Sequence, residues 1–156
     1  MMKRILTAVT LFAASSAFAG SPAVYEKSVN QALDVTYSNV SKALEDNGFR
    51  IVFEVDIGDN LSKNASKFGD NYNKNKLTGI KSLVFCNGKF ANQISNLDPS
   101  MLATCPLHAT LTHKDGMTTV LFVRPGFVAH GSPAAKAAQD LENATIKALE
   151  AGINAK

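Results

Sequence analysis

Nine consecutive residues, 49–57, alternate between apolar and mostly polar side chains, and no other feature constrains the fold as strongly. The apolar members of this series are Phe49, Ile51, Phe53, Val55 and Ile57. Successive side chains of a strand point to opposite faces of a sheet, so this alternation predicts a strand with one apolar face. A strand of this kind needs neighbouring strands and a layer that covers its apolar face.

A long helix near the end of the chain is predicted to supply that layer. Between residues 134 and 150, apolar residues fall on one arc of a helical projection and charged residues fall on the other. Ser132 is expected to cap this helix and Pro133 to occupy its first helical position. Gly152 is expected to end it.

The remaining elements are predicted from similar patterns. A strand is expected near residues 25–30, followed by a helix with Asp34 as its N-cap and Gly48 as its stop signal. The Asn- and Lys-rich residues 59–79 are expected to form a short surface helix and a polar loop. Three further strands follow, the last two joined by an Asp-Gly turn, and these are residues 79–86, 106–113 and 117–123. The order β-α-β-β-β-β-α, with short inserted helices, predicts an α+β fold with about five antiparallel strands.

The first residues of the chain are typical of a secretory signal peptide. Lys3 and Arg4 precede an apolar run that ends at Ala17-Phe18-Ala19. A short basic head, an apolar stretch and small residues before the cleavage point define this signal. The run is shorter than the ~20 residues needed to span a bilayer. We therefore expect cleavage after Ala19, a periplasmic or secreted protein with no membrane span, and a single domain over residues 20–156.

Charge and motifs exclude several classes of function. The whole chain carries +3, and two of those charges, on Lys3 and Arg4, belong to the predicted signal peptide. A nucleic-acid-binding protein usually has a concentrated basic face, so no nucleic-acid partner is expected. The sequence has no GxSxG, HExxH or phosphate-loop motif. It therefore favours a protein that is not an enzyme.

Cys86 and Cys105 are the only two cysteines and the most chemically informative residues of the chain. In an oxidising compartment paired cysteines usually form a disulfide, and two adjacent strand ends would bring these two together. A redox pair is a second interpretation, although their spacing is far from Cys-x-x-Cys. Binding of Cu(I) is a third, with Met101 as an additional soft ligand. No other metal site and no other cofactor is predicted.

Several segments resemble the domain-of-unknown-function 302 family of small bacterial and archaeal proteins. They are ALEDNGFRIVFEVDI at 43–57, the Cys86-Asn87 pair after a strand, and NLDPSMLATCP at 96–106. The resemblance covers roughly residues 25–150. It implies a fold like that of the TATA-binding-protein class, which is a curved antiparallel sheet of five strands with a long C-terminal helix across it. It implies no activity, because none is established for the family.

Two hypotheses about function remain open from the sequence. The first is an exported binding or accessory domain, held by a Cys86–Cys105 disulfide, that takes a small apolar ligand in a concave space lined by the apolar face from Phe49 to Val55. The second is a thiol-redox or copper-handling protein centred on Cys86 and Cys105. A homodimer formed through an exposed sheet edge is a further possible partnership.

Overall fold

The computed structural model describes residues 21–155. The predicted signal peptide, residues 1–19, lies outside these residues. No helix within 21–155 is long and apolar enough to cross a membrane. The elements follow one another as β1 (Val24–Val29), α1 (Leu33–Asp46), β2 (Arg50–Asp56), α2 (Ile57–Ser62), α3 (Ala65–Phe68), η1 (Gly69–Asn71), β3 (Gly79–Cys86), α4 (Gly88–Leu97), η2 (Pro99–Thr104), β4 (Leu107–Lys114), β5 (Met117–Val123), α5 (Pro125–Val128) and α6 (Ala135–Ile153).

The five strands form one antiparallel sheet in the order β1-β5-β4-β3-β2. The predicted α+β class, strand number and element order are therefore confirmed. The predicted Asp-Gly turn joins β4 to β5, and both of its central residues, Asp115 and Gly116, have positive φ angles. This backbone matches the right-handed twist of the two strands that it connects.

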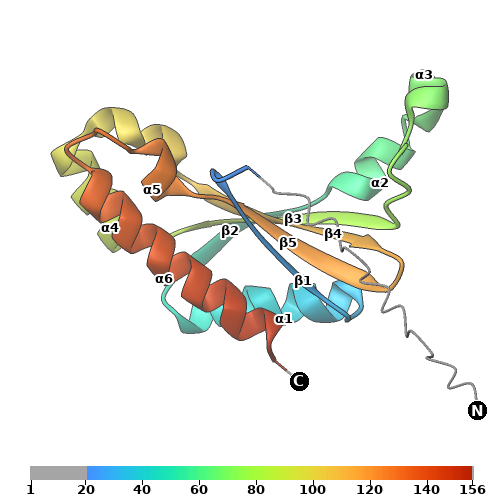
Figure 1. Ribbon diagram of the computed structural model, residues 1–156, viewed down its shortest axis with the longest axis horizontal. Helices are drawn as coiled ribbons and strands as arrows, with labels where there is room; N and C mark the ends of the chain where they lie inside the picture. Colours follow the sequence, from blue (N-terminus) through green and yellow to red (C-terminus); the bar gives the residue numbers. More distant parts are fainter. Residues whose placement is uncertain (1–20, 156) are drawn as a thin grey trace, which may run out of the picture.

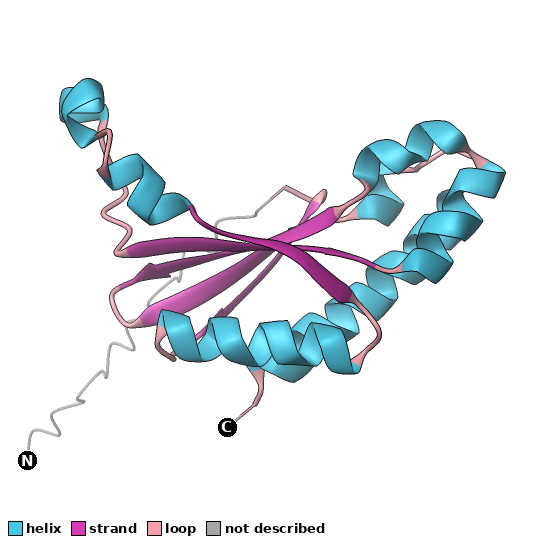
Figure 2. Ribbon diagram, turned by 180° about the vertical axis from the view of Figure 1, so that it is seen from behind, coloured by secondary structure: helices cyan, strands magenta, loops and turns pink. Residues whose placement is uncertain are grey.

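Helices α1 and α6 lie side by side against one face of the sheet, as Figures 1 and 2 show. The opposite face carries no helix that lies flat on it within the described part of the chain (Figure 2). At one end of the molecule α2 and α3 project from the body as an arm, and α4, η2 and α5 gather at the other end (Figure 1). The buried core lies between the sheet and the two helices and includes Val40, Leu44, Leu83, Phe85, Ala109, Leu111, Val120, Phe122, Leu141, Ala148 and Leu149.

Strand β2 departs from the alternation that the sequence predicts. Ile51 pairs with Phe85, but Phe53 pairs with Val84, so a β-bulge shifts the register by one residue. Such a shift sends the following side chains to the other face of the sheet. Phe53 is consequently 61% exposed, whereas Phe49 is buried. The prediction of one continuous apolar face from Phe49 to Val55 was wrong for this reason.

Helix α6 differs from its prediction at both ends. It begins at Ala135 rather than at Pro133, and Ala134 is its N-cap. The Ser132 hydroxyl lies before the helix, where it accepts from the Ala134 N–H and donates to Asp98. It continues to Ile153, so Gly152 does not end it. A Cβ at Gly152 would lie 2.6 Å from the Cα of Val40 in α1. Gly152 therefore lets the backbones of α1 and α6 approach each other.

We predict that Gly152→Ala destabilises the protein, although alanine ordinarily stabilises a helix relative to glycine. The new methyl group would overlap the backbone of Val40, and overpacking of this kind costs about 1–3 kcal/mol. Urea unfolding followed by circular dichroism measures the change. Gly88→Ala is the matched control, because nothing lies within 4 Å of a Cβ at that helical glycine. Equal stability of the two variants would contradict the prediction.

An ion pair between the buried Glu142 and the partly exposed Arg124 connects the end of β5 to α6. The Glu142 side chain is 1% exposed and accepts hydrogen bonds at 2.8 Å from Arg124 Nε and at 3.0 Å from the Gly126 N–H. Arg124 also donates to the carbonyl oxygen of Pro22, at the start of the described chain, at 3.0 Å. A buried carboxylate is tolerated only when such partners satisfy it. Glu142 therefore fixes where β5, α5 and α6 meet.

We predict that Glu142→Ala lowers the free energy of unfolding by about 1.5–3 kcal/mol, since it removes the charged acceptor of the hydrogen bonds from the partly exposed Arg124 and from the Gly126 N–H. Chemical denaturation measures the loss. Asp140→Ala, which removes an exposed carboxylate paired with Lys136 on the same helix, serves as the control and costs ~0–1 kcal/mol. Similar losses for both variants would show that the Glu142 pair does not have this role.

Candidate functional site

The fold brings the two cysteines to the same end of the sheet. Cys86 is the last residue of β3, and Cys105 ends η2 just before β4. Phe85 pairs with Leu107, so Cys86 lies one residue beyond this pair and Cys105 two residues before it. The predicted proximity of the two strand ends follows from this register.

The thiols are half-buried, and the structure contains both as free cysteines, so the expected disulfide is not formed in it. Burial raises the pKa of the Cys105 thiol, and the neighbouring Cys86 raises it further. The effect of Cys86 on Cys105 and their shared position at one end of the sheet mean that the two thiols are considered together. The disulfide stays a prediction for the exported protein.

The other predicted ligand, Met101, belongs to η2 and packs, partly buried, against the core. No group of three or more His, Cys, Asp or Glu side chains that could hold a metal ion occurs within residues 21–155. His113 lies far along β4 and shares a 2.9 Å hydrogen bond with Thr118. A copper site would therefore have to use the two thiols and the Met101 thioether.

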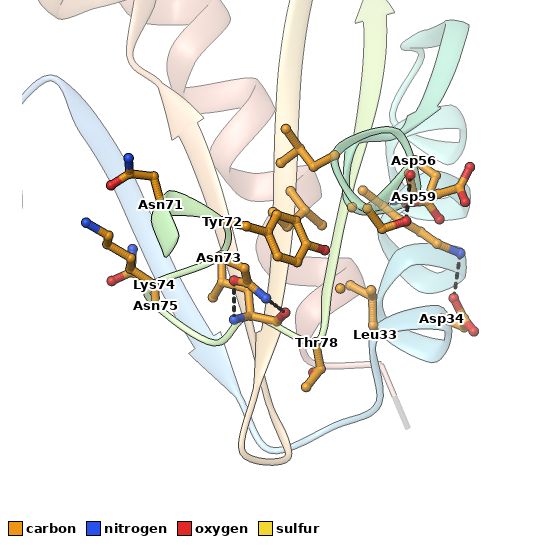
Figure 3. Close-up of a pocket in the computed structure, with 17 residues that line it drawn as sticks. Leu33, Asp34, Asp56, Asp59, Asn71, Tyr72, Asn73, Lys74, Asn75 and Thr78 are labelled. Carbon is orange, nitrogen blue, oxygen red and sulfur yellow. Dashed lines mark hydrogen bonds and ion pairs between the residues drawn. The ribbon is translucent and has the colours of Figure 1, made fainter. Parts of the chain in front are cut away.

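A pocket of about 750 Å³ lies at the opposite end of β3, under the arm. Figure 3 shows its walls: the end of β2 and α2 on one side, the loop from Asn71 to Thr78 on the other, and the start of α1 below. Its lining combines the apolar side chains of Leu33, Leu61, Leu77 and Ile80 and the ring of Tyr72 with carboxylates, amides and two lysines. Small-molecule sites have this size and this mixture of surfaces.

Local hydrogen bonds build the two walls. Asp56 is the N-cap of α2, and its Oδ1 accepts from the Asp59 N–H at 2.8 Å. On the other wall the Asn73 side chain donates to the carbonyl oxygen of Leu77 and accepts from its N–H, both at 2.8 Å. Asn73 has a φ of 42°, which asparagine tolerates better than most residues. These bonds hold the loop in the shape that leaves the pocket open.

Glycines let the walls approach the sheet. A Cβ at Gly58 would lie 3.0 Å from the backbone nitrogen of Ile80 in β3. A Cβ at Gly79 would overlap the Leu33 side chain at the beginning of α1. Glycine at these two positions therefore allows α2 to lie against β3 and α1 to start beside the pocket floor.

Ion pairs neutralise part of the pocket charge. Lys81 of β3 pairs with Asp34 at 2.7 Å, and its ammonium lies 5.5 Å from the centre of the Tyr37 ring. The hydrogen bond that Lys81 donates to Asp34 raises the pKa of the Lys81 ammonium. Asp34 was predicted as the N-cap of α1, but Ala32 occupies that position and Asp34 lies in the first turn. From there its side chain reaches Lys81 across the space between helix and sheet.

Tyr37, whose ring lies near the Lys81 ammonium, adds a further hydrogen bond next to the Asp34–Lys81 pair. Its hydroxyl donates to Glu54 Oε2 at 2.7 Å, and burial followed by this bond raises the pKa of the phenol. Because the bulge turns Glu54 toward the helices, the acid meets Tyr37 instead of solvent. The raised pKa keeps the phenol protonated at neutral pH, so Tyr37 acts here as a hydrogen-bond donor to Glu54.

Sequence reasoning missed this pocket. It placed a ligand space under the Phe49–Val55 face, which the bulge divides, and it treated residues 59–79 as a solvated surface. The stretch between β2 and β3 is about 20 residues long, and loops of that length in a compact domain are uncommon and usually functional. Its length, together with the Asn-rich turn at Asn71–Asn75, was the available signal.

Comparison with known proteins identifies the class to which this fold belongs. The family model described as "Domain of unknown function DUF302" matches residues 25–152. The chain therefore belongs to the DUF302 family, as the sequence resemblance indicated.

A solved structure shares the fold. The crystal structure of an uncharacterized conserved DUF302 protein from Bacillus stearothermophilus is similar with a TM-score of 0.72 and 18% sequence identity, covering 84% of this chain and 98% of that one. At this identity the likeness concerns the fold alone. No curated protein matches the chain.

Proposed function

We propose that this DUF302 chain is the precursor of an exported domain that binds a small ligand in the pocket between the arm and the sheet. The observation that carries the proposal is the pocket itself: about 750 Å³, with four aliphatic side chains and a tyrosine ring among a larger number of polar side chains. Volumes of about 300–1,000 Å³ are typical of ligand sites. The earlier expectation of a wholly apolar ligand is modified, since carboxylates line part of the space.

The arm supports this proposal because its position has no other evident role. Helix α2 contacts β3, while α3 and the tip project away from the body (Figure 1). It contributes no residue to the core, and its own apolar side chains, Leu61 and Phe68, are 39% and 43% exposed. A segment that is not needed to bury the core but forms one wall of a pocket is suited to binding.

We predict that Tyr72→Ala weakens the binding of small molecules at this pocket by about tenfold, because it removes the ring that stands at its centre (Figure 3). A fragment screen by protein NMR, together with native mass spectrometry for a copurifying ligand, measures binding. Phe68→Ala removes an aromatic ring from the same arm outside the pocket and is the matched control. If fragments bind nowhere near the pocket, or bind both variants equally, the proposal is wrong.

Export and a Cys86–Cys105 disulfide form the second part of the proposal. The N-terminal sequence supports export, and the register of β3 and β4 supports pairing, because Cα atoms at neighbouring strand ends fall within the roughly 7 Å that a disulfide requires. Closing a loop of about 20 residues stabilises a protein by about 3 kcal/mol in the chain-entropy model. The disulfide would then hold the end of the sheet that lies opposite the pocket.

We predict that the exported protein begins at Gly20 and that neither cysteine alkylates before reduction. Intact mass spectrometry of protein from the exported fraction, with and without a reductant, measures both features. A Cys86→Ser variant is the control, and in it Cys105 should alkylate without reduction. Free alkylation of both thiols in the oxidised fraction would exclude the disulfide, and a retained N-terminus would exclude cleavage.

The second candidate function is thiol chemistry at the same pair. The observation in its favour is that Cys86 ends β3 and Cys105 precedes β4 at the same end of the sheet, and that Cys86 contributes to the raised pKa of Cys105 after burial. A pair of this kind can exchange disulfides or, with Met101, hold Cu(I). The Cys86→Ser variant separates the two functions: loss of thiol exchange or copper binding at unchanged stability favours thiol chemistry, and loss of stability alone favours the structural disulfide.

A further inference from the structure

The negative charge of the pocket is only partly neutralised. Three aspartates line it, and two of them have lysine partners: Asp34 pairs with Lys81 at 2.7 Å and Asp59 with Lys63 at 2.5 Å. The third, Asp56, accepts one hydrogen bond from the Asp59 N–H at 2.8 Å. No lysine or arginine within residues 21–155 forms an ion pair with it. Asp56 is therefore the lining carboxylate with spare acceptor capacity and without a direct ion pair, although Lys81 lies opposite it in the β2–β3 register.

The remaining cation of the lining does not reach this acid. Lys74 lies on the opposite wall, and Figure 3 shows its side chain directed away from the Tyr72 ring and from Asp56. The ammonium of Lys81 is held by Asp34. The Asp56 charge also acts on its surroundings: it contributes to the raised pKa of Lys63, after the hydrogen bond and charge of Asp59, and to that of Lys81, after Asp34. Because Asp56 accepts only the bond from the Asp59 N–H, its remaining lone pairs can accept a hydrogen bond from a cationic donor in the pocket.

Beside Asp56 the pocket offers an apolar surface. The Tyr72 ring stands between the two walls, and Leu33 lies below it (Figure 3). Leu77 and Ile80 add aliphatic surface from the loop and from β3. A ligand that fits both features carries a cation at one end and an apolar body of modest size at the other. A purely apolar ligand would leave Asp56 desolvated without compensation, which is costly.

We propose that the pocket binds a small organic ammonium compound, with its charged nitrogen at Asp56 and its apolar body between Tyr72 and Leu33. This inference rests on the proposed binding function and specifies its ligand class. A charge-assisted hydrogen bond between the ammonium and Asp56 gives the discrimination, since such bonds are shorter and stronger than neutral ones.

Three probes of the same shape test the charge requirement. 2-Phenylethylamine is a cation at neutral pH, 2-phenylethanol is neutral, and phenylacetate is an anion. Each is titrated into the full chain and followed by isothermal calorimetry and by NMR shifts of the pocket residues. The amine should bind about tenfold more tightly than the alcohol, and phenylacetate should bind most weakly of the three.

Asp56→Asn tests the residue. Asparagine caps a helix as well as aspartate does, so the variant keeps α2 in place and removes only the charge. It should bind the amine about tenfold more weakly and the alcohol unchanged. Asp70→Asn, which neutralises an acid of the same arm outside the lining, is the control and should bind the amine as the parent protein does.

The outcomes separate this inference from the function on which it rests. If fragments or probes bind in the pocket but the amine has no advantage, or if Asp56→Asn binds it unchanged, the ammonium assignment is overturned and the binding function stands. If neither the probes nor the fragment screen find any ligand at the pocket, both are overturned. Selective loss of amine binding in Asp56→Asn, with Asp70→Asn unaffected, establishes the assignment.

Discussion

Burial of one face of the sheet under α1 and α6 is the constraint on which the rest of this molecule depends. The two helices cover the side chains of Leu83, Phe85, Leu111, Val120 and Phe122. They can do so together only because their backbones approach closely, and that approach requires glycine at position 152. Since this face is fully committed to the core, chemically useful groups are found at the ends of the strands and beside the arm.

Strand β3 separates the two candidate sites. Its first residues, Gly79 to Lys81, contribute to the pocket, and its last residue is Cys86. At about 3.4 Å per residue, Gly79 and Cys86 lie roughly 24 Å apart. A ligand in the pocket would therefore lie too far from the thiols to contact them. A disulfide at one end and a bound ligand at the other would each restrain a different end of the same sheet.

The sequence predicts the layers of this fold well and the site poorly, for identifiable physical reasons. Alternation in β4 and β5, the Asp115-Gly116 turn and the amphipathic α6 are local signals, and the structure confirms them. The exposure of Phe53 depends on a register shift against Val84, which only the pairing of two distant strands determines. The reach of Asp34 to Lys81 likewise joins residues 47 positions apart, so no local pattern reveals it.

The cysteine pair was partly predictable from the sequence. The positions of Cys86 at the end of one strand and Cys105 at the start of the next were evident from the sequence, and their proximity follows from the observed register. The pocket depends on short-range contacts of another kind, namely the close approach of Gly58 to Ile80 and the two bonds between Asn73 and Leu77. Such contacts depend on the position of the arm against β3, and no local sequence pattern predicts that position.

The bulge in β2 has a consequence for how copies of this chain can meet. β2 is an edge strand, and an edge offers unpaired backbone groups to any strand that arrives beside it. Between Ile51 and Phe53 the bulge shifts the spacing of these backbone groups, so an incoming strand could form regular hydrogen bonds with only one half of β2 at a time. The irregularity therefore makes β2 a poor template for continuous sheet growth, whereas β1, the other edge strand, pairs with β5 without a register shift.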